Sequence, residues 1–131
     1  MVFVDTGAWF AHFVPSGPDH SSARNWFDHN TRPLLTTDYV VDELLTLLKM
    51  RGEFQRALEV GPLLLDGDVC NLEWVTPIDV ENAWEVFSTY RDKAWSFTDC
   101  VSRVVMERLR IEMAIAFDIH FRQFGTVAVV P

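Results

Sequence analysis

The stretch that decides the fold is Met1-Val2-Phe3-Val4-Asp5-Thr6-Gly7-Ala8-Trp9. Its first four residues are apolar and β-prone, which predicts a short buried strand that ends at Asp5. Apolar side chains then recur at helical spacing from Trp9 to Val14, and Pro15 with the Gly17-Pro18 turn follows, so a helix is expected to end there. These residues therefore predict a strand that leads directly into a helix.

The alternation of strands and helices continues along the chain. Further strands are expected at Leu34-Leu35-Thr36, 70–75, 113–117 and 126–130. Helices are expected at 21–30, from a cap at Thr37 or Asp38 to Gly52, at 53–65 with a bend or split at Gly61-Pro62, at 77–93, and from a cap at Thr98 to Leu109. Short, apolar strands between helices predict an α/β fold, a three-layer α/β/α sandwich with a central, mainly parallel sheet.

Length and composition indicate one globular domain over residues 1–131. Hydrophobic residues make up 49% of the 131 and aromatic residues 13%, which is enough for a core without metal or disulfide staples. Apolar runs stay far below the ~20 residues of a membrane-spanning helix, and the first residues do not resemble an export signal. Cys70 and Cys100 lie in different predicted elements, so we expect free thiols and a reducing cytoplasm.

The charge balance of the chain is acidic. Eleven Lys and Arg residues against nineteen Asp and Glu residues give a formal net charge of −8. This is the wrong sign for a protein that holds nucleic acid by bulk electrostatics. The acidic surplus serves solubility, repels polyanions, or is gathered in part at one place to bind divalent cations, and the positions of the carboxylates decide between these roles.

Four carboxylates are predicted to converge on one edge of the sheet. Asp5 closes the first strand, Asp118 closes the fourth, and Asp99 lies in the first turn of the helix that feeds the fourth strand. Glu43 lies on the inner, apolar stripe of its helix, whereas the adjacent Asp42 should point about a hundred degrees away. Ligands of such sheets bind beyond the carboxyl ends of the strands, so these four side chains define a candidate cleft.

Four carboxylates in an apolar rim repel one another unless a cation neutralises them or some stay protonated. Mg²⁺ or Mn²⁺ is the expected ion, because hard cations prefer oxygen ligands. Thr6 and Thr98 place hydroxyl groups beside Asp5 and Asp99, where they could bond a carboxylate, a water or a phosphate oxygen. Each acid alone is more simply a helix cap or a surface charge, but the set of four favours a metal site.

Four sequence blocks carry a family resemblance that spans nearly the whole chain: Phe3-Val4-Asp5-Thr6-Gly7-Ala8-Trp9, Thr37-Asp38-Tyr39-Val40-Val41-Asp42-Glu43, Trp95-Ser96-Phe97-Thr98-Asp99-Cys100 and Ala116-Phe117-Asp118-Ile119-His120-Phe121. In this order they resemble the signature blocks of PIN-domain ribonucleases, above all the VapC-type toxins. The resemblance implies a PIN-like fold and a catalytic metal site formed by acidic residues, with two threonines as polar helpers: Asp5, Glu43, Asp99, Asp118, Thr6 and Thr98. One departure is Phe124, where many relatives have a smaller residue, and we expect it at the edge of the groove.

The resemblance also implies the reaction. A PIN ribonuclease hydrolyses RNA phosphodiester bonds with one or two Mg²⁺ or Mn²⁺ ions, by an in-line displacement that leaves a 5′-phosphate and a 3′-hydroxyl. Asp5 and Asp99 would be the central metal ligands, Glu43 would bind a second metal or orient the nucleophilic water, and Asp118 would act through a water. The protein would form a homodimer, and a small antitoxin protein would fill a groove of apolar and basic residues.

Candidate substrate contacts are Lys49, Arg51, Arg91, Lys93 and His120. Local basic stripes could hold phosphates despite the negative net charge, although solvated helix faces and ion pairs such as Glu107 with Arg103 or Arg110 explain basic residues equally well. Trp95 could stack a base. The remaining tryptophans are expected in the core: Trp9, Trp26, Trp74 and Trp84.

Other interpretations stay open. A response-regulator phosphoacceptor domain also gathers acids at strand ends, but it needs a paired acid on one strand and a lysine after a late strand, and neither is visible. A haloacid-dehalogenase-like phosphatase needs a second Asp two positions after the first, where this chain has Gly7. A non-catalytic binding module would not need the four acids. Within the PIN family, the chain could also be a stand-alone nuclease in RNA processing.

Overall fold

A five-stranded sheet forms the middle layer of the protein. The computed structural model describes residues 1–131, and the strands are all parallel in the spatial order β3-β2-β1-β4-β5. The strands are β1 (Val2–Val4), β2 (Leu34–Thr37), β3 (Asn71–Glu73), β4 (Met113–Ile115) and β5 (Ala128–Val130). The central strand β1 is buried along its whole length, as its apolar sequence predicts.

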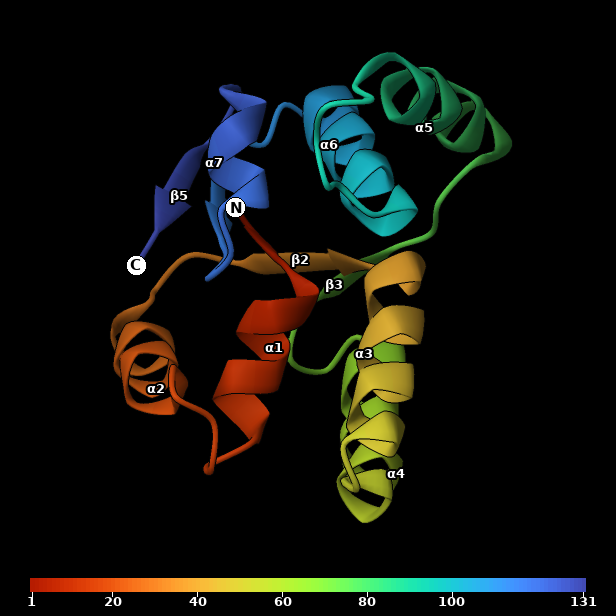
Figure 1. The fold of residues 1–131 in the computed structure, drawn as a ribbon. Coiled ribbons are helices and arrows are strands. Elements are labelled where there is room, and N and C mark those ends of the chain that lie inside the picture. Colours follow the sequence, from red (N-terminus) through yellow and green to blue (C-terminus); the bar gives the residue numbers. More distant parts are fainter.

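Helices cover both faces of this sheet. Figure 1 shows α1 to α4 below the sheet and α5, α6 and α7 above it. The helices are α1 (Thr6–Phe13), α2 (His20–His29), α3 (Asp38–Met50), α4 (Phe54–Leu65), α5 (Pro77–Thr89), α6 (Phe97–Leu109) and α7 (His120–Phe124). The prediction of a three-layer α/β/α fold with a mainly parallel sheet is confirmed. None of the helices is both long and apolar enough to cross a membrane.

The strand order brings the carboxyl ends of β1 and β4 together. The chain passes from β1 to β2 and β3 on one side, and then crosses to β4 on the other side of β1. Val4 pairs with Ile115, and the Asp5 N–H donates to the Ile115 carbonyl at 3.2 Å. This reversal of strand order is a topological switch point, the place where open α/β sheets bind their ligands.

Several helices differ from the sequence prediction, and the helix predicted over 77–93 ends at Thr89. The cap of α6 is Ser96 and not Thr98: the Ser96 hydroxyl accepts from the Asp99 N–H, and the Asp99 carboxylate accepts from the Ser96 N–H. This reciprocal pair is a capping box, which satisfies two backbone donors at once and therefore starts the helix two residues earlier. Of the two alternatives expected at Gly61-Pro62, a bend or a split, the split is wrong, because α4 runs as one helix with the solvent-exposed Pro62 inside it.

Two of the tryptophans expected in the core lie on the surface. Trp74 is 63% exposed and Trp84 is 60% exposed, whereas Trp9 is buried and its indole Nε1–H donates to Thr36 Oγ1 at 3.2 Å. Trp74 follows the edge strand β3, and Trp84 lies on α5, an outer helix that packs against α6. An edge strand and an outer helix have only one neighbour each, so an apolar residue on the far side stays in solvent.

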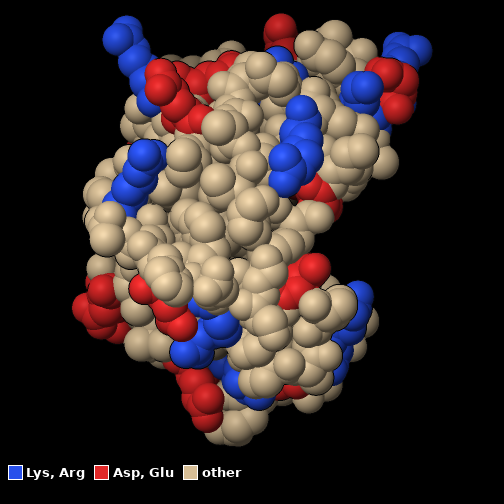
Figure 2. Space-filling view, turned by 90° about the vertical axis from the view of Figure 1, so that its left-hand side faces the viewer, with Lys and Arg blue, Asp and Glu red and all other residues tan.

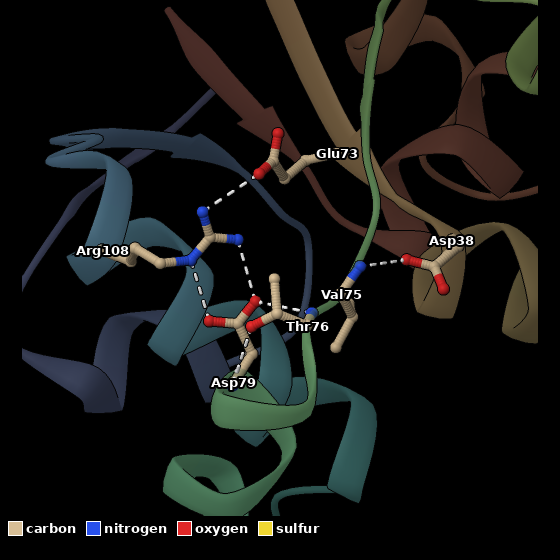
Figure 3. A network of polar contacts seen from close by, with 6 residues as sticks. All are labelled: Asp38, Glu73, Val75, Thr76, Asp79 and Arg108. Carbon is tan, nitrogen blue, oxygen red and sulfur yellow. Dashed lines mark hydrogen bonds and ion pairs between the residues drawn. The ribbon is translucent and has the colours of Figure 1, made fainter.

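A polar network fastens the edge strand β3 to the helices above the sheet (Figure 3). Arg108 of α6 donates through Nε and Nη2 to the two oxygens of Asp79, each at 2.8 Å, and through Nη1 to Glu73 of β3 at 3.0 Å. Asp79 is only 1% exposed and also completes the capping box of α5 with Thr76. Nearby, Asp38 accepts from the Val75 N–H at 2.7 Å. Arg108 is therefore the cation that compensates a buried carboxylate.

Removal of the Arg108 charge should destabilise the fold. Burial alone would raise the pKa of Asp79, but hydrogen bonds from Arg108 and Thr76 lower this pKa below its usual value. We expect Arg108→Gln to lower the free energy of unfolding at pH 7 by about 2 kcal/mol, because it leaves a buried carboxylate without its cation. A carboxylate whose pKa is lowered by folding stabilises the fold at neutral pH and loses this contribution as the pH falls.

Urea unfolding at pH 7 and at pH 3 measures this effect. The difference in free energy of unfolding between wild type and Arg108→Gln should shrink as the pH falls toward 3, because protonation of Asp79 removes the charge that Arg108 compensates. The matched control is Arg110→Gln, because Arg110 is exposed at the C-cap of the same helix and has no ion pair. Equal stabilities of wild type and Arg108→Gln at pH 7 would show that the network does not hold the elements together.

Candidate active site

Asp5 lies at the centre of the candidate site. It follows β1 directly and occupies the N-cap position of α1, where its backbone carbonyl accepts from the N–H groups of Ala8 and Trp9, both at 3.1 Å. The carboxylate does not cap the helix, and the residue is only 2% exposed. A Cβ at Gly7 would lie 3.8 Å from Asp5 Oδ2, so this glycine leaves open space beside the carboxylate.

Asp99 reaches the same edge of the sheet from α6. The capping box with Ser96 fixes its side chain, and the residue is only 5% exposed. Its Oδ2 accepts from the Ser96 N–H at 3.0 Å and lies 2.9 Å from His120 Nδ1. Burial raises the pKa of Asp99, the Ser96 N–H lowers it, and the Asp118 charge raises it, with a net increase. The sequence places the acid correctly, and the capping box explains its orientation.

Asp118, in the loop after β4, and His120, the first residue of α7, complete the site. Asp118 is exposed, and its Oδ1 accepts from the His120 N–H at 3.0 Å. The His120 ring lies between two carboxylates, with Nδ1 at 2.9 Å from Asp99 Oδ2 and at 3.8 Å from Asp118 Oδ2. His120, one of the predicted substrate contacts, therefore lies next to Asp99 and Asp118.

Glu43 approaches from α3 with the helix phase that the sequence predicts. It is half-buried and its charge acts on Asp5, whereas Asp42 is exposed. Both residues, with Thr98, line a hollow of about 390 Å³ beside the acids. Thr6 is buried and its Oγ1 has no hydrogen-bond partner.

The negative charges of Asp118, Asp99 and Glu43 all act on Asp5. Burial raises the pKa of Asp5 well above its usual value, and the charges of Asp118, Asp99 and Glu43 raise it further, against a smaller lowering by the Thr6 N–H. A buried carboxylate surrounded by three others is unfavourable as an anion, so the arrangement favours a bound cation or proton. Structural carboxylates in proteins are usually paired with a cation, and no lysine or arginine pairs with Asp5 here.

The donor set fits a hard divalent cation. Carboxylate oxygens and the unpartnered Thr6 hydroxyl are oxygen ligands, which Mg²⁺ and Mn²⁺ prefer. The side chains as they stand do not form a group of three or more acidic, His or Cys ligands tight enough to hold an ion. His120 takes up Asp99 Oδ2, one of the oxygens that such a group would need. Mg²⁺ typically keeps several waters, so it does not require every acid as a direct ligand.

The predicted basic contacts separate into two groups. Arg51 is the C-cap of α3 and lines a cavity of about 310 Å³ together with Gly7 and Asp118, next to the acids. Lys49 is exposed, and its ammonium lies over the Phe54 ring at 5.6 Å. In contrast, Arg91 and Lys93 line a different hollow of about 420 Å³, between α5 and α6, that contains none of the four acids.

Two predictions about aromatic residues near the site are wrong. Trp95 is buried, and its Nε1–H donates to Gln123 at 3.0 Å, so it is not free to stack a base. Phe124 is also buried and packs against Trp95 and Phe121, with ring centroids 4.9 Å apart in both pairs, instead of forming the edge of a groove. The short helix α7, absent from the prediction, positions both contacts.

The expected ion pair between Arg103 and Glu107 is confirmed, with Arg103 Nε 3.2 Å from Glu107 Oε1.

Comparison with known proteins agrees with this geometry. A model of the PIN domain matches residues 2–127. The chain therefore belongs to the PIN-domain family.

Within this family the chain is similar to VapC ribonucleases. VapC20 of Mycobacterium tuberculosis, a 23S rRNA-specific endonuclease, is 32% identical over 131 residues, which are 100% of this chain and 99% of the relative. Ribonuclease VapC26 of the same organism is 26% identical over 117 residues, 89% of this chain and 86% of the relative. The crystal structure of VapC20, a sarcin-ricin loop cleaving toxin, matches with a TM-score of 0.93 at 30% identity over 100% of both chains.

The repulsion at Asp5 predicts that this residue weakens the fold in the absence of metal. Asp5→Asn keeps the shape of the side chain and removes the buried charge. In chelator-treated protein we expect the melting temperature to rise by a few degrees, on the order of 4 °C. Thermal unfolding followed by circular dichroism measures the change, with Asp42→Asn as the control that leaves it unaltered. A lower melting temperature for Asp5→Asn would show that the acids do not repel one another.

Proposed function

We propose that the chain is a metal-dependent endoribonuclease and the toxin of a toxin-antitoxin pair. The observation that carries this proposal is the buried Asp5 carboxylate, raised in pKa by burial and by three other acids at the switch point of the sheet. The relatives support it, because VapC20 and VapC26 are both named as ribonucleases. The acids also argue against a non-catalytic module, which would have no use for them.

We assign the metal ligands as follows. Asp5 and Asp99 would hold Mg²⁺ or Mn²⁺ directly, Glu43 would hold a second ion or orient the attacking water, and Asp118 would act through a water. Thr6 and Thr98 supply hydroxyl groups beside these ligands. A bound Mg²⁺ or Mn²⁺ supplies a more acidic water and neutralises charge on the phosphate.

The other residues position these groups. Ser96 fixes Asp99 through the capping box, and His120 Nδ1 lies 2.9 Å from Asp99 Oδ2, where a proton on Nδ1 would be donated to the carboxylate. Hydrolysis by water attack leaves a 5′-phosphate and a 3′-hydroxyl and does not require the 2′-hydroxyl. His120 is exposed enough to touch the substrate as well as Asp99.

Ribosomal RNA is the proposed substrate. VapC20 is named for 23S rRNA and for the sarcin-ricin loop, and it matches this chain over the full length of both. The face in Figure 2 gives no general basis for RNA binding: it shows Lys and Arg side chains scattered among Asp and Glu, with broad uncharged areas between them. Recognition would therefore depend on local contacts near the acids.

The partners we propose are a second copy of the chain and a small antitoxin protein. Exposed apolar side chains offer a surface for association, and they lie mainly along α3 and α4 and around α5: Met50, Phe54, Leu58, Leu65, Trp74, Ile78 and Trp84. We place the activity in the cytoplasm, where RNA is available and where the two buried free thiols, Cys70 and Cys100, stay reduced.

Single substitutions of the acids test the proposal. Asp5→Asn and Asp99→Asn should each reduce cleavage of a sarcin-ricin stem-loop RNA in Mg²⁺ or Mn²⁺ by about 100-fold or more, because each removes several kcal/mol of metal-dependent stabilisation. Glu43→Gln should reduce cleavage strongly, whereas the neighbouring Asp42→Asn should leave it nearly unchanged.

The readout is the appearance of labelled fragments on a gel, with circular dichroism to confirm that each variant is folded. Full activity of Asp5→Asn and Asp99→Asn would refute the nuclease site. Equal inactivity of Asp42→Asn and Glu43→Gln would instead show that the two faces of α3 are not distinguished as proposed.

A further inference from the structure

We propose that the cavity beside the acids, called here the α1–α3 pocket, receives one base of the RNA substrate and selects for bases that carry an amino group. This proposal rests on the proposed nuclease function and names a part of its substrate recognition. The pocket has a volume of about 310 Å³ and lies between α1, α3 and the loop after β4. Its walls include Phe10, Leu47 and Phe117, and its polar residues include Asp19, Arg51 and Asp118.

The pocket adjoins the acids directly. Asp118 belongs to both, because it lines the pocket and its Oδ1 binds the His120 N–H. Gly7 lines the pocket too, two residues after Asp5, and a Cβ built there would lie 3.8 Å from Asp5 Oδ2. An RNA strand with a phosphate at the acids would therefore have a neighbouring nucleotide at the pocket.

The walls suit a flat, uncharged ring. Phe10 and Phe117 are half-buried, and neither ring stacks on another aromatic ring, although most aromatic side chains near the core do. Stacking on such rings is the usual way in which proteins hold bases of single-stranded RNA. The hollow on the Glu43 side of the acids, in contrast, contains no aromatic residue.

The charged groups indicate which part of the nucleotide enters. Asp19 and Asp118 present carboxylates that repel a phosphate but accept hydrogen bonds from an amino group. Asp19 is exposed, does not cap α2 with its side chain and has no ion pair, so its carboxylate is free to bind. Adenine, guanine and cytosine carry an amino group, whereas uracil does not.

Arg51 supplies a positive charge at the same pocket. It lines the pocket, is exposed and has no ion pair. A positive group at this place can bind the phosphate that follows a bound base. The combination of apolar walls, the unpaired Asp19 carboxylate, the Asp118 carboxylate and the unpaired Arg51 matches the parts of a nucleotide.

Titration with two nucleotides tests the pocket without a cleavage reaction. Adenosine 5′-monophosphate and uridine 5′-monophosphate share the same phosphate and sugar, so a bound metal ion affects both alike and the difference reports on the base. In nuclear magnetic resonance spectra of the wild-type protein with Mg²⁺, we expect the adenine nucleotide to shift the signals of Phe10 and Phe117 and to bind several-fold more tightly than the uracil nucleotide.

Two variants and a matched control sharpen the test. Arg51→Gln should weaken binding of the adenine nucleotide about tenfold, through loss of a charged hydrogen bond. Phe117→Leu should weaken it at least about fivefold, through loss of stacking. Arg32→Gln is the control, because Arg32 is equally exposed but lies before β2, at the opposite edge of the sheet. In the stem-loop cleavage assay, Arg51→Gln should lower kcat/KM about tenfold, mainly through KM.

The experiments give different results when the proposed pocket is wrong and when the proposed nuclease function is wrong. Equal binding of the two nucleotides, shifts confined to other surfaces, or unchanged affinity in Arg51→Gln would overturn the pocket while wild-type RNA cleavage still supported the nuclease. Shifts of Phe10 and Phe117 by an antitoxin alone, and by neither nucleotide, would also overturn it. Selective binding of the adenine nucleotide by a protein that cleaves no RNA would support the pocket and refute the nuclease.

Discussion

Burial of the Asp5 carboxylate at the carboxyl end of β1 is the constraint around which the site is built. The strand order places β4 against β1, so that the loop with Asp118 emerges beside Asp5, and α6 brings Asp99 to the same edge. Each added acid makes the ionised form of Asp5 less favourable, as its raised pKa records. In the working protein, a bound ligand or a proton must offset the unfavourable free energy of the ionised Asp5 carboxylate. The functional conclusion follows from this uncompensated negative charge around Asp5 more than from any single residue.

Much of the fold could be predicted because local sequence and tertiary structure agree. The apolar stretch before Asp5 forms the buried central strand, and Thr37 caps α3 as its position suggests. Glu43 and Asp42 differ in burial as the helical period requires. The misses have physical reasons. Ser96 competes with Thr98 for the cap through a reciprocal hydrogen bond, and the burial of Trp95 depends on α7, a helix of five residues that is too short for a periodic signal.

The site illustrates how an acidic protein can be suited to a polyanionic substrate. The net charge of −8 opposes RNA at long range, and Figure 2 shows no continuous basic surface on the face that it presents. Next to the acids there are two basic side chains: Arg51, which has no ion pair, and His120, which lies within the cluster. Affinity for RNA would then depend on the cation that neutralises the acids. RNA binding and catalysis would both require this cation. The spacing of residues along the chain could not reveal the pocket, since its walls come from four separate segments.

Binding of Mn²⁺ to the purified protein tests the central claim most directly, without any assumption about the RNA. Isothermal titration calorimetry, together with thermal unfolding at increasing Mn²⁺ concentration, should show saturable binding and a melting temperature that rises with the metal, because a ligand that binds only the folded state stabilises it. Asp99→Asn should lose most of both effects, and Asp42→Asn should keep them. Absence of binding heat and of any change in melting temperature for the wild-type protein at millimolar Mn²⁺ would contradict the account.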